Sequence, residues 1–179
     1  MNKREVRQRS KERIAALSEK EKIACGKEIA ARLFASEEYR KAASIFLYLS
    51  TTDEADTHLV LSHALSEGKT LYLPRIEGKD MALVPYREGD PLAVNRYGIS
   101  EPTGAGAEVT PDLAVIPLVA FDRTKTRLGR GKGYYDRFLS SFRGTSIALA
   151  FSAQEWDLLP AEPFDRKPSV ILTEKERIE

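Results

Sequence analysis

The chain has 179 residues, of which 42% are hydrophobic and 31% are charged, as in an ordinary globular protein. Its 28 basic and 27 acidic residues leave a net charge of +1 at pH 7. This balance argues against a protein coated for nucleic acid or membrane binding, because such a surface needs an excess of Lys and Arg. We expect a single domain over residues 1–179 that acts as a monomer.

Cys25 is the single cysteine, so no intrachain disulfide is possible. This fits a reducing compartment. The N-terminal residues are polar and charged, and no stretch approaches the roughly 20 apolar residues that cross a bilayer. We therefore expect a cytoplasmic protein without a signal peptide or a membrane span.

The first predicted elements are two helices, over residues 2–16 and 19–34. They are separated near Ser18, which has capping-box spacing to Glu21. The short apolar run at residues 43–49 then predicts a buried strand.

After a turn, Asp56 or Thr57 is expected to cap a helix that continues to about Ser66. Residues 70–73 predict the next strand, which we expect Pro74 to close.

The second half of the chain alternates strands with loops and one helix. Residues 87–111 are rich in Gly, Pro and Thr and are predicted to be mostly loop. The alternation of strands and helices favours an α/β fold, with a mostly parallel sheet flanked by helices. The remaining predicted elements are strands at 81–86, 112–117, 145–151 and 170–173 and a helix at 134–142.

A basic, glycine-rich loop, RLGRGKGYYDR, occupies residues 127–137 between a predicted strand and a predicted helix. Glycines at alternate positions allow backbone N–H groups to approach a ligand, and the helix adds a positive dipole end. Residues 122–137 hold six basic and two acidic side chains, a local charge of +6 − 2 = +4. Together these features predict a binding site for an anion such as phosphate.

This loop is not a Walker A motif, which needs Lys followed by Ser or Thr, because Gly133 follows Lys132. It is not the dinucleotide fingerprint either, because the third glycine comes one residue early. The ordinary alternative is a flexible surface loop with solvated charges.

Two carboxylates are candidate metal ligands. Asp136 lies one turn into the predicted helix, where it could hold Mg²⁺ beside a phosphate group, or could pair with Arg130 or Arg137. Asp165 is a candidate second ligand, or an ordinary turn residue.

At this loop the sequence resembles the 5-formyltetrahydrofolate cyclo-ligase (5,10-methenyltetrahydrofolate synthetase) family. The resemblance is most specific in AFDRTKTRLGRGKGYYDRFL, residues 120–139. Weaker similarities occur in the expected order elsewhere, at residues 3–7, 50–57, 73–75, 97–102 and 163–174.

The resemblance implies a fold similar to that of sugar-phosphate isomerases and CoA transferases. It implies that ATP and Mg²⁺ are used to convert 5-formyltetrahydrofolate to 5,10-methenyltetrahydrofolate, with release of ADP and phosphate. The implied ATP contacts are Lys3, Arg4, Arg7, Arg127, Leu128, Gly129, Arg130, Gly131, Lys132, Gly133, Tyr134 and Tyr135. The implied folate contacts are Leu49, Glu54, Arg130, Gly131, Lys132, Gly133 and Tyr134. Mg²⁺ is implied at Asp136 and Asp165, and catalysis is assigned to Arg130, Lys132 and Tyr134.

Without the resemblance, several of these residues have an ordinary interpretation. Lys3 and Arg7 share a helix face, which could simply be solvated. Glu54 could accept hydrogen bonds from a pterin or favour a helix N-terminus. Tyr134 and Tyr135 could stack on a ligand or pack.

The leading hypothesis is therefore an ATP-dependent cyclo-ligase. The second is a folate- or nucleotide-binding protein without turnover. A sugar-phosphate isomerase is a third hypothesis, which rests on analogy of fold alone.

Overall fold

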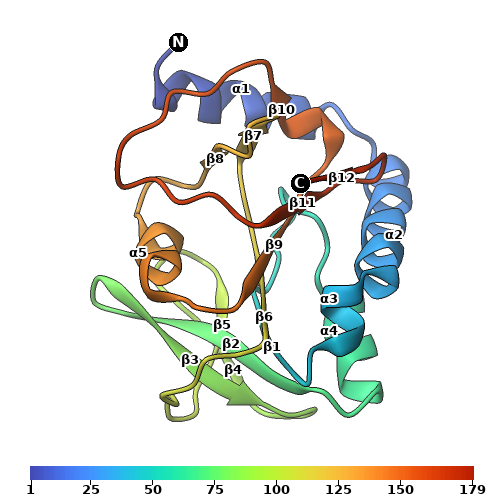
Figure 1. Ribbon diagram of the computed structural model, residues 1–179, viewed down its shortest axis with the longest axis vertical. Coiled ribbons are helices and arrows are strands. Elements are labelled where there is room, and N and C mark those ends of the chain that lie inside the picture. The colour runs from blue at the N-terminus through green and yellow to red at the C-terminus, as the bar shows by residue number, and fades with distance from the viewer.

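The computed structural model describes residues 1–179 and is built around a seven-stranded sheet (Figure 1). The strand order is β12-β11-β9-β6-β1-β2-β3, and all neighbours are parallel except the two edge pairs, β11–β12 and β2–β3. The strands are β1 (Ser44–Leu47), β2 (Thr70–Glu77), β3 (Asp80–Tyr86), β6 (Leu113–Ile116), β9 (Thr145–Leu149), β11 (Val170–Leu172) and β12 (Arg177–Ile178). The predicted α/β fold with a mostly parallel sheet is confirmed.

Both faces of this sheet are covered. Successive residues of a strand point to opposite faces, so neighbouring residues of β1 belong to different hydrophobic cores. On β1, Ile45 and Leu47 belong to the larger core, under the helices α2 to α4. Phe46 faces the smaller core, where its ring centroid lies 4.7 Å from that of Phe138 on α5. Figure 1 shows α5 on the side of the sheet away from α2, α3 and α4. The helices are α1 (Lys3–Ala15), α2 (Glu19–Ala35), α3 (Glu37–Lys41), α4 (His58–Ser66) and α5 (Tyr134–Ser141).

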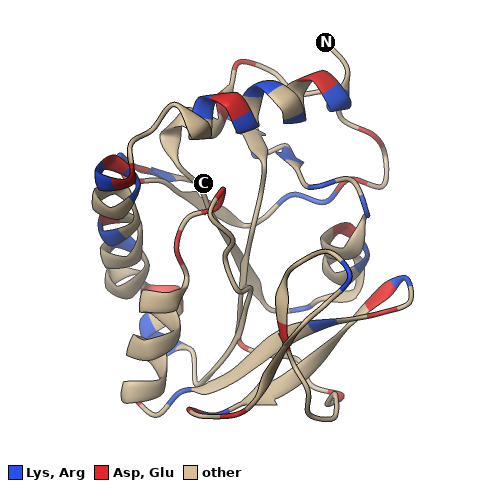
Figure 2. Ribbon diagram, turned by 180° about the vertical axis from the view of Figure 1, so that it is seen from behind, with Lys and Arg blue, Asp and Glu red and all other residues tan.

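The helix starts follow local capping chemistry. The predicted capping box of Ser18 and Glu21 is present at α2, and Asn2 forms another with Glu5 at α1. Thr57 is the N-cap position of α4, but its hydroxyl donates to the Tyr48 carbonyl instead of capping the helix. Basic residues outnumber acidic ones along α1 (Figure 2). None of the helices has the length and apolar character that a membrane span needs.

The predicted end of the second strand at Pro74 is wrong, since β2 continues to Glu77. Pro74 is aligned with Leu83 of the antiparallel partner β3. β1 pairs with β2 only as far as Tyr72, so the proline lies where one edge of the strand is free, and there it is tolerated.

Residues 87–111 contain more structure than the predicted loop. β4 (Leu92–Val94) and β5 (Ser100–Pro102) form a hairpin. Other short elements outside the predictions are α3, β7 (Ala120–Asp122), β8 (Arg127–Leu128), β10 (Glu155–Trp156) and the 3₁₀ turn η1 (Ser152–Gln154). Strands of two or three residues are too short to show a period in the sequence.

Asp122 holds the turn that leads into the glycine-rich loop. The residue is fully buried, and one carboxylate oxygen accepts from the N–H groups of Thr124 and Thr126 and from the Thr124 hydroxyl. The other oxygen accepts from the Leu159 N–H at 3.0 Å. Burial alone would raise the pKa of Asp122, but these hydrogen bonds outweigh burial and lower it. The charged carboxylate therefore stabilises the loop entrance.

Asp122→Asn is expected to lower the free energy of unfolding by about 2 kcal/mol at pH 7, because the amide NH₂ must face a backbone donor. The carboxylate contributes stability above about pH 4, and this contribution is lost as the pH falls through the lowered pKa. Denaturant unfolding of both proteins between pH 7 and pH 3 should show the difference shrinking in acid. Asp157→Asn, at an exposed position, is the control. A difference that is constant with pH would contradict the role of the charge.

Candidate active site

A pocket of about 520 Å³ opens at the carboxyl ends of β1 and β6. The chain leaves β1 toward β2 and β3 on one side of the sheet, and leaves β6 toward β9 and β11 on the other. This is a topological switch point, where ligand sites of open α/β sheets lie. Tyr48 and Leu49 line the pocket just after β1, and residues 117–119 line it just after β6.

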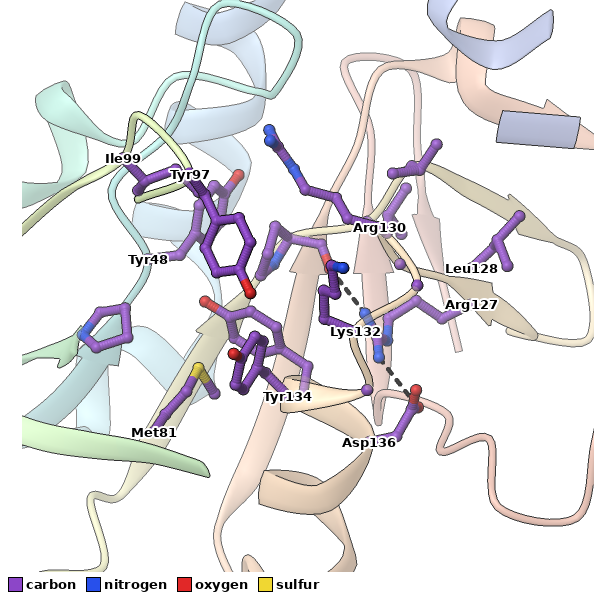
Figure 3. Close-up of a pocket in the computed structure, with 18 of the residues that line it drawn as sticks. Tyr48, Met81, Tyr97, Ile99, Arg127, Leu128, Arg130, Lys132, Tyr134 and Asp136 are labelled. Atoms are coloured by element: carbon purple, nitrogen blue, oxygen red, sulfur yellow. Dashed lines mark hydrogen bonds and ion pairs between the residues drawn. The ribbon is translucent and has the colours of Figure 1, made fainter. Parts of the chain in front are cut away.

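The glycine-rich loop forms one wall of the pocket and leads directly into α5 (Figure 3). Gly133 is the N-cap of α5 with a φ of 74°, and Gly131 has a φ of 99°. These left-handed values favour glycine. A Cβ at Gly131 would also lie 3.1 Å from the guanidinium carbon of Arg7. The sequence thus places glycine where the loop must turn and where α1 approaches it.

Arg127 is buried beneath this loop and does not point freely into the pocket. Its Nη2 donates to Oδ1 of Asp136 at 3.1 Å, and its Nη1 donates to the Pro117 carbonyl at 3.2 Å. Its Nε has no hydrogen-bond partner. Asp136 therefore pairs with Arg127, and not with the two arginines considered from the sequence.

Arg130 extends across the pocket to the turn after β1. Its Nη2 donates to Oε1 of Glu54 at 3.0 Å and to the Thr51 hydroxyl at 2.6 Å. The second oxygen of Glu54 accepts from the Thr51 N–H at 2.9 Å. Both carboxylate oxygens of Glu54 thus accept hydrogen bonds from within the protein.

The first turn of α1 closes the other end of the pocket. Nζ of Lys3 donates to Oδ2 of Asp165 at 2.7 Å and also pairs with Glu162. Arg7 donates from Nε to the Gly129 carbonyl at 2.8 Å. Arg4 is exposed and does not line the pocket. It follows Lys3 directly, and adjacent residues of a helix lie on different faces.

Lys132 and Arg7 are the pocket cations without a carboxylate partner, and Arg7 already donates to the Gly129 carbonyl. Nζ of the exposed Lys132 lies 5.8 Å from the centroid of the Tyr97 ring. Tyr134 donates from its hydroxyl to the Gly78 carbonyl at 3.1 Å. A hydrogen bond with Tyr134 and the nearby charges of Arg96 and Lys132 lower the pKa of Tyr97. Lys132 is thus the charge most available to an incoming anion.

The other side chains facing this end are mostly apolar. Leu49 is buried, and Tyr135 packs against Phe46 with ring centroids 6.4 Å apart. Burial raises the pKa of Tyr135, so its phenol stays neutral. Met81 and Tyr97 complete this wall, as Figure 3 shows. A planar organic ligand would fit between such side chains.

Except for Arg4, every residue that the resemblance implies lines this one pocket: Lys3, Arg7, Leu49, Glu54, Asp136, Asp165 and residues 127–135. The pocket also includes Met81, Asn95, Tyr97, Glu162 and Phe164, which were not predicted as site residues. Gly98, which follows Tyr97 and has a φ of 75°, is the residue in the sequence that could have indicated the turn of this hairpin.

The two candidate metal ligands differ in their surroundings. Oδ1 of Asp136 accepts from Arg127 and from the Arg166 N–H, whereas its Oδ2 makes no hydrogen bond. Both oxygens of Asp165 are bound by Lys3 or by the Glu162 N–H. No group of three His, Cys, Asp or Glu side chains converges here. One carboxylate completed by ligand oxygens and water is the coordination that Mg²⁺ takes beside phosphates, so Asp136 suits it as it stands.

Comparisons with known proteins agree with the geometry. The chain is 33% identical to the 5-formyltetrahydrofolate cyclo-ligase of Haemophilus influenzae, over 72% of this chain and 74% of that protein. It is 28% identical to the Mus musculus cyclo-ligase over 96% and 93% of the two chains. The NMR structure of Aquifex aeolicus 5,10-methenyltetrahydrofolate synthetase superposes with a TM-score of 0.87 at 33% identity, covering 99% of this chain and 92% of that one.

A sequence profile of the 5-formyltetrahydrofolate cyclo-ligase family also matches residues 1–174. With this match over almost the whole chain, the protein belongs to the 5-formyltetrahydrofolate cyclo-ligase family.

Proposed function

We propose that this enzyme converts 5-formyltetrahydrofolate to 5,10-methenyltetrahydrofolate, using ATP and Mg²⁺ and releasing ADP and phosphate. The observation that carries the proposal is the central position of the glycine-rich loop in one pocket. Lys3, Arg7 and Asp136 lie on one side of it, and Leu49 and Glu54 lie on the other. An ATP triphosphate on the loop would therefore meet a folate that lies against the apolar wall.

The chemistry explains why both ligands must meet there. A formamide oxygen is a poor leaving group, and transfer of the γ-phosphoryl group from ATP to that oxygen makes it a good one. N10 of the folate then attacks the activated carbon, and departure of phosphate leaves the methenyl bridge. Phosphoryl transfer needs positioning and charge stabilisation more than covalent help from the protein.

The loop side chains supply that stabilisation. Lys132 and Arg130 would donate to the oxygens of the transferring phosphoryl group. Tyr134, the first residue of α5, would help to close the folate side. Glu54 would accept hydrogen bonds from the pterin amino and ring N–H groups. Oδ2 of Asp136 would hold Mg²⁺, whose charge neutralises phosphate oxygens, and Asp165 would become a second ligand only after Lys3 has turned to the triphosphate.

We also place the enzyme in the cytoplasm as a monomer. The single cysteine supports a reducing compartment. Size-exclusion chromatography with light scattering tests the oligomeric state.

The purified protein, mixed with 5-formyltetrahydrofolate and MgATP, is expected to produce methenyl-folate and ADP in equal amounts. The methenyl-folate is followed by its absorbance. EDTA should stop the reaction, and excess Mg²⁺ should restore it. Calorimetry alongside an ADP assay separates turnover from binding alone. Tight binding of both ligands without ADP release would favour a sequestering protein instead.

Lys132→Ala and Arg130→Ala are each expected to lower kcat/KM about 100-fold, since loss of a charged donor to a transferring group raises the barrier by about 3 kcal/mol. Steady-state kinetics with circular dichroism checks turnover and folding together. Arg143→Ala, which removes the same charge at an exposed position outside the pocket, is the control. Kinetics near wild type in both loop variants would remove the loop from the mechanism.

A further inference from the structure

The ion pair between Arg130 and Glu54 joins two groups that the proposed function gives to different substrates. Arg130 belongs to the glycine-rich loop and Glu54 to the turn after β1, 76 residues earlier in the chain. In Figure 3 the Arg130 side chain extends away from Arg127 and Asp136. In this arrangement, the arginine that the proposed function needs at the phosphate is held on the proposed folate side.

The ion pair competes with both proposed substrates for these two groups. Oε1 of Glu54 accepts from Arg130 and Oε2 accepts from the Thr51 N–H. A pterin presents an amino group and a ring N–H side by side, and such a pair of donors needs both carboxylate oxygens. A bound pterin therefore competes with Arg130 for Oε1, and a guanidinium displaced from Glu54 needs another anion.

The surroundings of the two side chains favour this exchange. The Glu54 side chain is only 10% exposed, so its charge needs a partner at all times, and the pterin donors replace the one they remove. The Arg130 side chain is 46% exposed and can rotate without disturbing the core. An ATP triphosphate on the loop is the nearest strong anion that the released guanidinium could bind.

We propose that Glu54 is a positioning residue that couples the binding of the two substrates by holding Arg130 away from the phosphate position until a folate pterin takes its carboxylate. The inference rests on the proposed function. Coupling is reciprocal, so the triphosphate, by drawing Arg130 away, frees Glu54 for the folate. The enzyme thereby binds each substrate more tightly when the other is present.

A purely structural role for the pair gives a different expectation. If the pair only anchors the turn after β1, breaking it disorders the site and lowers the affinity for both ligands. If the pair couples the ligands, breaking it releases Arg130. The enzyme then binds the nucleotide more tightly and the folate more weakly. The two roles therefore predict opposite changes in nucleotide affinity when the pair is broken.

The test is calorimetric titration of a non-hydrolysable MgATP analogue into the full chain, with and without saturating 5-formyltetrahydrofolate. In the wild type, folate is expected to tighten the analogue about tenfold, within the usual range for coupled sites. In Glu54→Gln, the analogue alone should bind about as tightly as it binds the folate-loaded wild type, and folate should add less than twofold. The glutamine carbonyl can still accept from the Thr51 N–H, so the turn should remain folded.

Asp53→Asn is the matched control, since it removes the same charge from an exposed neighbour in the same turn. It should keep the tenfold coupling. Thr51→Val removes the second acceptor for Arg130 and should tighten the analogue about twofold while coupling persists.

Two failures are distinguishable. A wild type that makes no methenyl-folate from 5-formyltetrahydrofolate and MgATP would refute the proposed function. A wild type that turns over, but whose folate leaves analogue affinity unchanged or whose Glu54→Gln variant binds the analogue more weakly, would refute the coupling alone.

Discussion

The pairing of three pocket cations with carboxylates is the interaction on which the arrangement of the site depends. Lys3, Arg127 and Arg130 surround one loop, and their mutual repulsion would be costly at a partly desolvated surface. Asp165, Asp136 and Glu54 each neutralise one of them. Each of these carboxylates is also a group that the proposed reaction uses for a metal ion or for the folate. In the proposed function, the groups for the metal ion and the folate thus neutralise the groups for the triphosphate.

The fold makes this arrangement possible by bringing distant segments to one point. The carboxyl ends of β1 and β6 lie side by side at the switch point of the sheet. The turn after β1 carries Glu54, and the chain after β6 continues through β7 and β8 into the glycine-rich loop. Positive φ angles at Gly131 and Gly133 let that loop pass close to α1 and enter α5. The rigid sheet therefore sets the separation of the two proposed half-sites.

Local patterns in the sequence predicted much of this structure. The central strands, α2, α5 and the glycine-rich loop have clear periodicity, capping or charge signals, and Asp136 was expected in the first turn of α5, where it lies. Partners distant along the chain were not predictable, because nothing in the residues around Arg130 points to Glu54. Residues 87–111 were predicted as loop because strands of three residues, such as β4, leave no periodic pattern. The continuation of β2 through Pro74 depended on which neighbouring strand had ended, which only the sheet register shows.

The contact between Lys3 and Asp165 joins residues separated by 162 positions. Closing so large a loop carries a high entropic penalty in the unfolded chain, so the contact forms only once the sheet has brought both segments together. A ribosome must therefore finish almost the whole chain before this end of the pocket exists. If this end of the pocket binds the nucleotide as proposed, then nucleotide binding becomes possible only in the completed fold, and bound ATP would report that the chain has folded correctly.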